Sequence, residues 1–199
     1  MRILIIGAGG AIGGQLFADL KILDHDVIGT TRPQRVESFP MVGVDLLDMS
    51  RTMETLAELG NFESVVFAAG VGDLASCERQ QEVSKFVNVK SAVTLCEHFL
   101  KTGCSRFVYL SSGRVFSGDR SFVSADGQRD PKSELGRQKS EAEKTTCREQ
   151  LEKLNREVVN YQNAIISNFN AYSFSCLLKL DHILANFVQY FLSFYLYIL

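Results

Sequence analysis

The sequence predicts an α/β fold in which one doubly wound parallel sheet carries helices on both faces. The first observation is a set of short, continuous apolar runs, which are typical of strands buried on both faces. The second is that these runs alternate with segments of helical spacing, the order that a parallel sheet requires. The third is a glycine-rich turn directly after the first run, at residues 7–13. The 199 residues suffice for one domain with its own core.

The predicted elements follow one another in a regular order up to about residue 145. The run from Ile3 to Ile6 is the clearest strand, and the helix after it places Leu16, Leu20 and Leu23 on one side. The polar residues 113–133 are expected to form a loop. Strands are predicted at 3–6, 26–30, 42–44, 64–69 and 107–110, and helices at 12–23, 52–59, 86–100 and 134–159.

The composition changes near residue 158, which predicts a domain at 1–160 and a separate aromatic and apolar segment at 161–199. From Val158 onward the only charged residues are Lys179 and Asp181. Residues 183–199 are apolar but interrupted by polar side chains, and they reach only the short limit of a membrane span, about 17 residues. A buried or partner-covered helix is the favoured interpretation. A membrane-associated segment is disfavoured, and an altered C-terminus that packs poorly is a further alternative.

Charge and cysteine usage exclude several classes of protein. The formal net charge is −2, and no basic surplus points to nucleic acid. The five cysteines are dispersed without a CxxC pair, which indicates a reducing compartment and neither a disulfide framework nor a metal site. The first apolar run is too short for a signal peptide, so a cytoplasmic protein is expected.

The turn at residues 7–13 is typical of a Rossmann-like, NAD(P)-binding domain. Gly7 permits a tight turn, Gly10 lets the backbone approach a pyrophosphate, and Gly13 lets the helix pack near the strand. The helix that begins near Ala11 and Ile12 would offer its N–H groups and positive dipole end to the phosphates. The alternative is a plain glycine-rich turn, which the position between a buried strand and a helix disfavours.

The ends of the later strands suggest which dinucleotide binds. Arg32 follows the second strand, where an acidic residue would favour NAD and an arginine suits a 2′-phosphate. NADP(H) is therefore favoured and NAD(H) is the alternative, unless Arg32 is simply a solvated surface charge. Asp45 and Leu46 end the third strand and could contact adenine, although Asp45 could equally cap the next helix. The small residues Ala68, Ala69 and Gly70 end the fourth strand and leave room for a ligand, or for tight helix–sheet packing.

Several motifs in this order resemble the extended short-chain dehydrogenase/reductase superfamily, and most closely its dTDP-4-dehydrorhamnose reductase-like, sugar-nucleotide-binding branch. The resemblance covers residues 1–145. The motifs that carry it are the turn Gly7–Gly13, the strand end Val66–Gly70, the segment Val87-Asn88-Val89, the segment Leu110–Phe116 and the segment Gly136–Glu143.

The resemblance implies a catalytic set of Ser or Thr, Tyr and Lys. Ser112 matches the Ser or Thr, and Lys139 matches the Lys that also holds the nicotinamide ribose. The position of the Tyr, which would exchange a proton with the substrate oxygen, is occupied by Leu135. Leucine cannot exchange a proton, so carbonyl reduction is expected to be poor or absent. The alternative is that Lys139 is only a surface charge on an amphipathic helix.

Two functions therefore remain open, beside a third interpretation as a degenerate or truncated relative with no stable function. The first is an NAD(P)-dependent reductase or epimerase that acts on a nucleotide-sugar-like small molecule. The second is a non-catalytic dinucleotide-binding or regulatory protein that docks a partner through residues 161–199. The substrate-binding part that follows the Tyr–Lys helix in the family is expected to be reduced or absent. A homodimer through residues 86–100 and 134–159 is implied by the resemblance.

Overall fold

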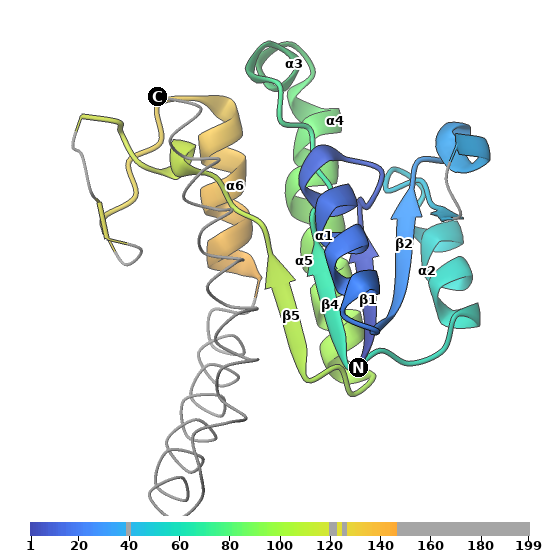
Figure 1. Ribbon diagram of the computed structural model, residues 1–199. Helices are drawn as coiled ribbons and strands as arrows, with labels where there is room; N and C mark the ends of the chain where they lie inside the picture. Colours follow the sequence, from blue (N-terminus) through green and yellow to red (C-terminus); the bar gives the residue numbers. More distant parts are fainter. Residues whose placement is uncertain (39–40, 120–122, 125–126, 147–199) are drawn as a thin grey trace, which may run out of the picture. The chain divides into compact units, whose positions relative to one another are not determined.

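The computed structural model describes residues 1–38, 41–119, 123–124 and 127–146. Their centre is one sheet of five parallel strands in the order β3-β2-β1-β4-β5 (Figure 1). The strands are β1 (Arg2–Ile6), β2 (Asp26–Thr31), β3 (Val42–Gly43), β4 (Ser64–Phe67) and β5 (Arg106–Tyr109). This order confirms the predicted doubly wound α/β, Rossmann-like fold.

Helical segments connect the strands. They are α1 (Ala11–Ile22), the 3₁₀ segment η1 (Pro33–Ser38), α2 (Met49–Glu58), α3 (Leu74–Arg79), α4 (Gln81–Lys85), the π-helix η2 (Phe86–Lys90), α5 (Ser91–Lys101), the 3₁₀ turn η3 (Gly113–Val115) and α6 (Glu134–Thr145). Side-chain caps begin three of the α-helices, since Asp48, Asp73 and Ser133 accept backbone N–H bonds at the first turns of α2, α3 and α6.

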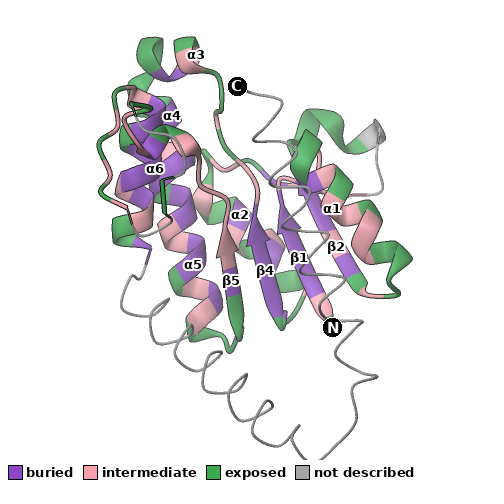
Figure 2. Cartoon of the chain, turned by 60° about the vertical axis from the view of Figure 1, so that its left-hand side comes forward, coloured by how far each residue is buried: buried purple, intermediate pink, exposed green. Residues whose placement is uncertain are grey.

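Each face of the sheet has its own apolar core. Figure 2 shows the buried residues along the strands and on the helices beside them. On one face Leu4 and Phe67 pack with Leu56 of α2 and with Leu95 and Phe99 of α5. On the other face the β1 and β2 side chains pack against Leu16 and Phe17 of α1. The alternation along β1 places successive apolar side chains in opposite cores, which is why the strand is apolar throughout.

The structure refines several predicted boundaries. The predicted strand at 64–69 ends at Phe67, and the helix predicted from residue 86 begins with the π-helix η2 before it becomes α5. The prediction of a loop at 113–133 was wrong at its start, where η3 forms a single 3₁₀ turn. α6 begins at Glu134 as predicted. The remainder of that predicted helix, and the segment 161–199, lie outside the described residues.

Candidate functional site

The connections that leave β1 and β4 at the carboxyl edge of the sheet run to opposite faces of the sheet. β1 lies between β2 and β4, and the helix after β1 covers one face while α2 and α5 cover the other. Ligands of open parallel sheets bind at such a switch point. We call the group formed by Gly7–Gly13, Ala68–Gly70, Ser112, Leu135 and Lys139 the switch-point site.

The turn after β1 requires glycine at two positions, because its backbone packs closely against the segment after β4 and against the start of α1. Gly7 has a φ of +93°, a left-handed conformation that favours glycine. A Cβ atom on Gly7 would lie 2.6 Å from the backbone nitrogen of Ala69, just beyond β4. A Cβ atom on Gly13 would lie 2.4 Å from the carbonyl oxygen of Gly7. The turn therefore packs tightly between the start of α1 and the end of β4.

Gly10 has a different role, because it leaves open space beside the turn. It is the exposed N-cap of α1, and a Cβ atom there would meet only the Gly7 carbonyl oxygen, at 3.3 Å. Ala11 and Ile12 in the first helical turn are also exposed, and that turn contains no acidic residue. Because the first N–H groups of a helix lack intrahelical partners and lie at its positive dipole end, this turn can bind an anion.

A pocket of about 390 Å³ lies at the ends of β2 and β3. Its lining residues are Arg32, Pro33, Gln34, Arg35, Asp45 and Leu47. The Arg35 guanidinium donates a hydrogen bond to the carbonyl oxygen of Gly9 at 3.4 Å, which joins the pocket to the glycine turn. Leu46 packs half-buried against the core, whereas the adjacent Leu47 is 49% exposed. Leu47 is therefore the leucine that faces this pocket.

On the other side of the switch point, the end of β4 meets Lys139. Ala68 and Ala69 are half-buried, and Gly70 is exposed. A Cβ atom on Gly70 would lie 2.9 Å from Oδ1 of Asn88 and 3.5 Å from Nζ of Lys139. The small side chains therefore let Lys139 lie directly against this strand end.

The Lys139 ammonium is held in a largely dehydrated position. The residue is 8% exposed, and its Nζ donates to the carbonyl oxygen of Leu110 at 2.9 Å. Nζ also lies 4.7 Å from the ring centroid of Tyr109. Burial lowers the pKa of Lys139 to about 8, an effect that the nearby Cys77 and Glu143 oppose. Lys139 is therefore no solvated surface charge.

The position before Lys139 on the same side of α6 carries no proton donor. Leu135, one helical turn earlier, is 6% exposed. Tyr109 cannot substitute for the absent phenol, since its hydroxyl donates to the backbone oxygen of Asn88 at 3.1 Å and burial raises its pKa. Ser112 follows β5 and accepts a hydrogen bond from the backbone N–H of Arg114 at 3.2 Å, which leaves its own proton for a ligand.

The sequence model of the family described as the RmlD substrate binding domain matches residues 1–157. The chain belongs to this family. Membership confirms the resemblance that the motifs indicated. No curated protein matches the chain.

Solved structures share the fold of this RmlD-domain chain. A hypothetical dTDP-4-dehydrorhamnose reductase from Sulfolobus tokodaii is 23% identical with a TM-score of 0.65, over 73% of this chain and 51% of that one. MoeE5 in complex with UDP-glucose and NAD is 24% identical with a TM-score of 0.64, over 73% and 48%. The dTDP-4-dehydrorhamnose reductase from Bacillus anthracis in complex with NADP is 20% identical with a TM-score of 0.62, over 73% and 49%. The chain thus spans about half the length of these structures.

The motifs of this RmlD-domain chain include two residues, Gly9 and Asn88, to which the sequence analysis assigned no role in the site. A Cβ atom on Gly9 would lie 2.2 Å from Oγ1 of Thr31, so Gly9 lets the turn approach the end of β2. Asn88 is fully buried on η2, where it contacts both the segment after β4 and α6. An asparagine between apolar residues of a predicted buried helix was a usable signal, because a buried amide needs partners.

Beside Lys139, a carboxylate joins α6 to the segments after β5. Glu143, one turn after Lys139, accepts hydrogen bonds from the Ser111 hydroxyl and the Arg129 guanidinium. Arg129 also lies 6.0 Å from the ring centroid of Phe116. These contacts hold the strand end that carries Ser112 against the helix that carries Lys139.

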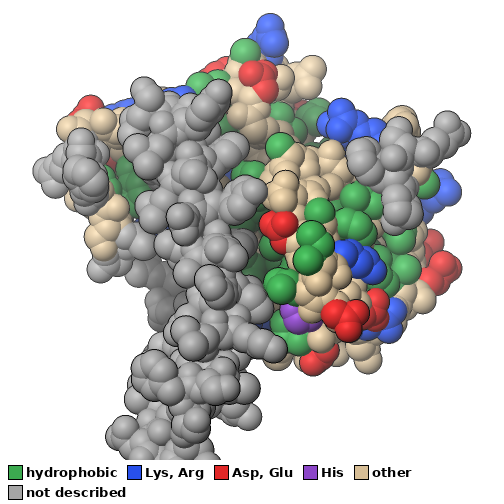
Figure 3. All heavy atoms as spheres, in the orientation of Figure 1, with side chains coloured by type: hydrophobic (Ala, Val, Ile, Leu, Met, Phe, Trp, Pro, Cys, Tyr) green, Lys and Arg blue, Asp and Glu red, His purple; other side chains and the backbone are tan. Residues whose placement is uncertain are grey.

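The described part of the chain offers neither a metal-binding cluster nor a membrane-spanning helix. Among the described residues, no group of three His, Cys, Asp or Glu side chains is arranged to bind a metal ion. Likewise, none of the helices in residues 1–146 that the structure describes has the length and apolarity to span a membrane. On the face drawn in Figure 3, acidic and basic side chains are interspersed among the described residues.

Proposed function

We propose that the chain binds a nicotinamide dinucleotide at the switch-point site, with NADP(H) favoured over NAD(H). The observation that carries the proposal is the turn after β1, where Gly7 and Gly13 are required by packing and Gly10 keeps the helix N-terminus open. The residues present fit the group: the turn would bind the pyrophosphate, and Lys139 would bind the nicotinamide ribose. The names of the solved relatives, which bind NAD or NADP, support the same cofactor class.

The proposed reaction is hydride transfer at the carbonyl of a nucleotide-sugar-like small molecule, impaired by the residue at position 135. The cofactor supplies or accepts the hydride when it is bound. Ser112 can donate a hydrogen bond to the substrate oxygen, and Lys139 keeps a cation beside it. Leu135 can neither donate nor accept the proton that this oxygen needs, so general acid–base catalysis is missing.

The leucine at position 135, where a proton donor is missing, also favours a second candidate function. A chain that keeps the nucleotide-binding turn but lacks the proton donor could act as a non-catalytic, regulatory nucleotide-binding protein. In that case its partner would dock on residues 161–199, which lie outside the described residues. The two functions predict the same nucleotide binding but different responses to restoring a tyrosine at position 135.

Titration with NADPH and with NADH, followed by nucleotide fluorescence, tests the binding proposal. Wild type is expected to bind NADPH more tightly than NADH. Gly10→Ala is expected to weaken both affinities by about tenfold or more, because its methyl group enters the space left for the pyrophosphate. Gly72→Ala is the matched control, since Gly72 is exposed with no atom near its added Cβ. Equal affinities for Gly10→Ala and wild type would contradict the assignment of the turn.

Arg32→Ala tests the preference between the two nucleotides. Loss of a charged contact to the 2′-phosphate is expected to weaken NADPH binding by about 10- to 100-fold and to leave NADH binding unchanged. The control is Arg106→Ala, which removes an exposed arginine at the start of β5, the opposite edge of the sheet. A similar loss of affinity for both nucleotides in Arg32→Ala would rule out selection of the 2′-phosphate by Arg32.

A further inference from the structure

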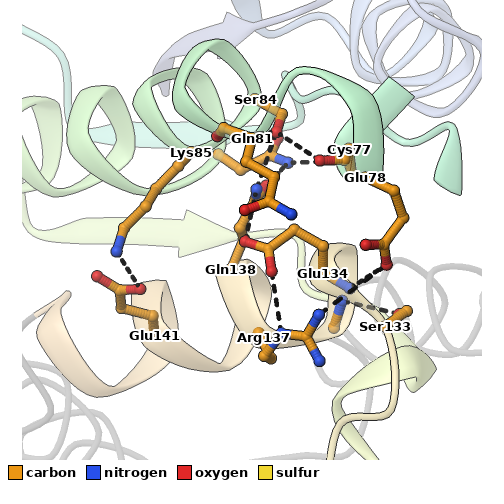
Figure 4. Close-up of polar contacts among 12 residues, drawn as sticks. Cys77, Glu78, Gln81, Ser84, Lys85, Ser133, Glu134, Arg137, Gln138 and Glu141 are labelled. Carbon is orange, nitrogen blue, oxygen red and sulfur yellow. Dashed lines mark hydrogen bonds and ion pairs between the residues drawn. The ribbon is translucent and has the colours of Figure 1, made fainter. Parts of the chain in front are cut away.

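A chain of buried polar groups joins α6 to α4 and η2, with Gln138 at its centre (Figure 4). Gln138 is 1% exposed. Its Oε1 accepts a hydrogen bond from Nδ2 of Asn88 at 2.8 Å. Its Nε2 donates to Oγ of Ser84 at 2.8 Å and to Oε1 of Glu134 at 3.1 Å. The oxygen and the nitrogen of the Gln138 amide therefore both have partners inside the protein, and these bonds fix the orientation of the Gln138 side chain.

The same chain of bonds continues to the segment after β4. Oδ1 of Asn88 accepts from the backbone N–H of Val71 at 2.8 Å, and Nδ2 donates to the Val71 carbonyl oxygen at 3.0 Å. The Cβ atom that Gly70 lacks would lie 2.9 Å from the same Oδ1. Gln138 is thus linked, through one asparagine, to the strand end that borders the switch-point site.

Lys139 follows Gln138 directly in α6, so a shift of the helix displaces both side chains together. The structure gives the Lys139 ammonium one hydrogen bond, to the Leu110 carbonyl oxygen, and no ion pair with a described carboxylate. That bond ties the lysine to the segment after β5 and to neither α4 nor η2. Gln138, by contrast, has three bonds to α6, α4 and η2 and is held on both sides of its amide.

We propose that Gln138 is a positioning residue: its bonds to Ser84 and Asn88 fix α6 and thereby hold the Lys139 ammonium against the end of β4. The effect on nucleotide affinity rests on the function proposed above, whereas the placement of Lys139 does not. An apolar residue at 138 would keep the space filled but leave the Ser84 hydroxyl and the Asn88 amide without one partner each.

Gln138→Leu in the full chain tests the proposal, with the position of Lys139 read from its ionisation. The pH dependence of Lys139 reductive methylation, measured by peptide mass spectrometry, gives its pKa. The groups that face Lys139 stay unchanged in this variant: the Tyr109 ring, the Leu110 carbonyl, Cys77 and Glu143. The pKa is expected to rise from about 8 toward 10.5 as the ammonium gains water.

The matched control is Arg137→Ala, which changes the neighbouring residue of the same helix. Arg137 is exposed, and it forms ion pairs with the exposed Glu78 and with the half-buried Glu134 (Figure 4). This variant is expected to leave the pKa of Lys139 near 8 and the affinity for NADPH unchanged. In Gln138→Leu, NADPH affinity is expected to fall on the order of tenfold, because the ribose contact moves.

Each outcome decides the proposal. A lower melting temperature with an unchanged pKa of Lys139 would mean that Gln138 only stabilises the fold, and would overturn it. If wild type binds no nucleotide, the proposed function fails, but the pKa of Lys139 in the variant still tests the positioning. If Gln138→Leu does not fold, Ser84→Ala removes only one of the bonds, and it is expected to raise the same pKa by a smaller amount. An unchanged pKa in Ser84→Ala would then overturn the proposal.

Discussion

Leu135→Tyr is expected to raise the rate of NADPH-dependent carbonyl reduction by about 10²–10⁴-fold, the contribution of a well-placed general acid. The new phenol would lie one helical turn before Lys139, on the same side of α6. The nearby ammonium would lower the pKa of the phenol and so ease its loss of a proton. NADPH consumption with a small 1,2-diketone measures this rate, because such a substrate needs no sugar-nucleotide-binding part.

Leu135→Phe is the matched control for this gain. Phenylalanine adds the same ring without the hydroxyl, so any effect of volume at this buried position appears in both variants. The gain is expected in Leu135→Tyr alone. Equal rates in the two variants would exclude the missing hydroxyl as the cause of weak catalysis. In a protein that binds NADPH, that result would favour the non-catalytic function.

Lys139→Met is expected to change the pH dependence of stability by about 3 kcal/mol, the free-energy equivalent of the lowered pKa. Burial lowers the pKa of Lys139 from 10.5 to about 8 in the folded state. Between these two pH values the unfolded chain binds more protons, so the free energy of unfolding of wild type rises with pH. Below pH 8 the lysine is charged in both states, and folding has to bury that charge. Lys139→Met removes this dependence.

Urea unfolding of wild type and Lys139→Met at pH 7 and pH 10 measures the difference. Wild type is expected to gain stability relative to the variant as the pH rises. Lys144→Met serves as the control, because Lys144 is exposed on the same helix and stays in water in both states. A difference between wild type and Lys139→Met that is constant with pH would contradict the burial of a charged Lys139.

The sheet could be predicted because burial on both faces makes its strands apolar throughout. β1 and the start of α1 were placed within one residue of the predicted ends, since a glycine turn separates them. α3 and α4 were missed because each is shorter than two helical turns and shows no apolar periodicity. The cap that Asp73 provides was visible in the sequence but is a weak signal without such periodicity.

The sequence motifs predicted which residues belong to the candidate site, but they did not predict which of these residues contact one another. The order of motifs led to Gly7, Ser112 and Lys139. The contact of Gly70 with Lys139 depends on how β4 and α6 pack, which no local pattern encodes. The same holds for the lowered pKa of Lys139, because its cause is burial in the folded chain. The π-helix was missed because its five residues, Phe86–Lys90, are too few to show a periodicity of their own.

The hydrogen bonds of Gln138 also affect the order in which parts of the chain fold during synthesis. Its partners Ser84 and Asn88 precede it by 54 and 50 residues, so they leave the ribosome well before it. Until α6 emerges, their side chains must stay hydrated or find other partners. Docking of α6 would therefore be a late step for the nascent chain, and the glycine turn at residues 7–13 would form before Lys139 reaches the candidate site.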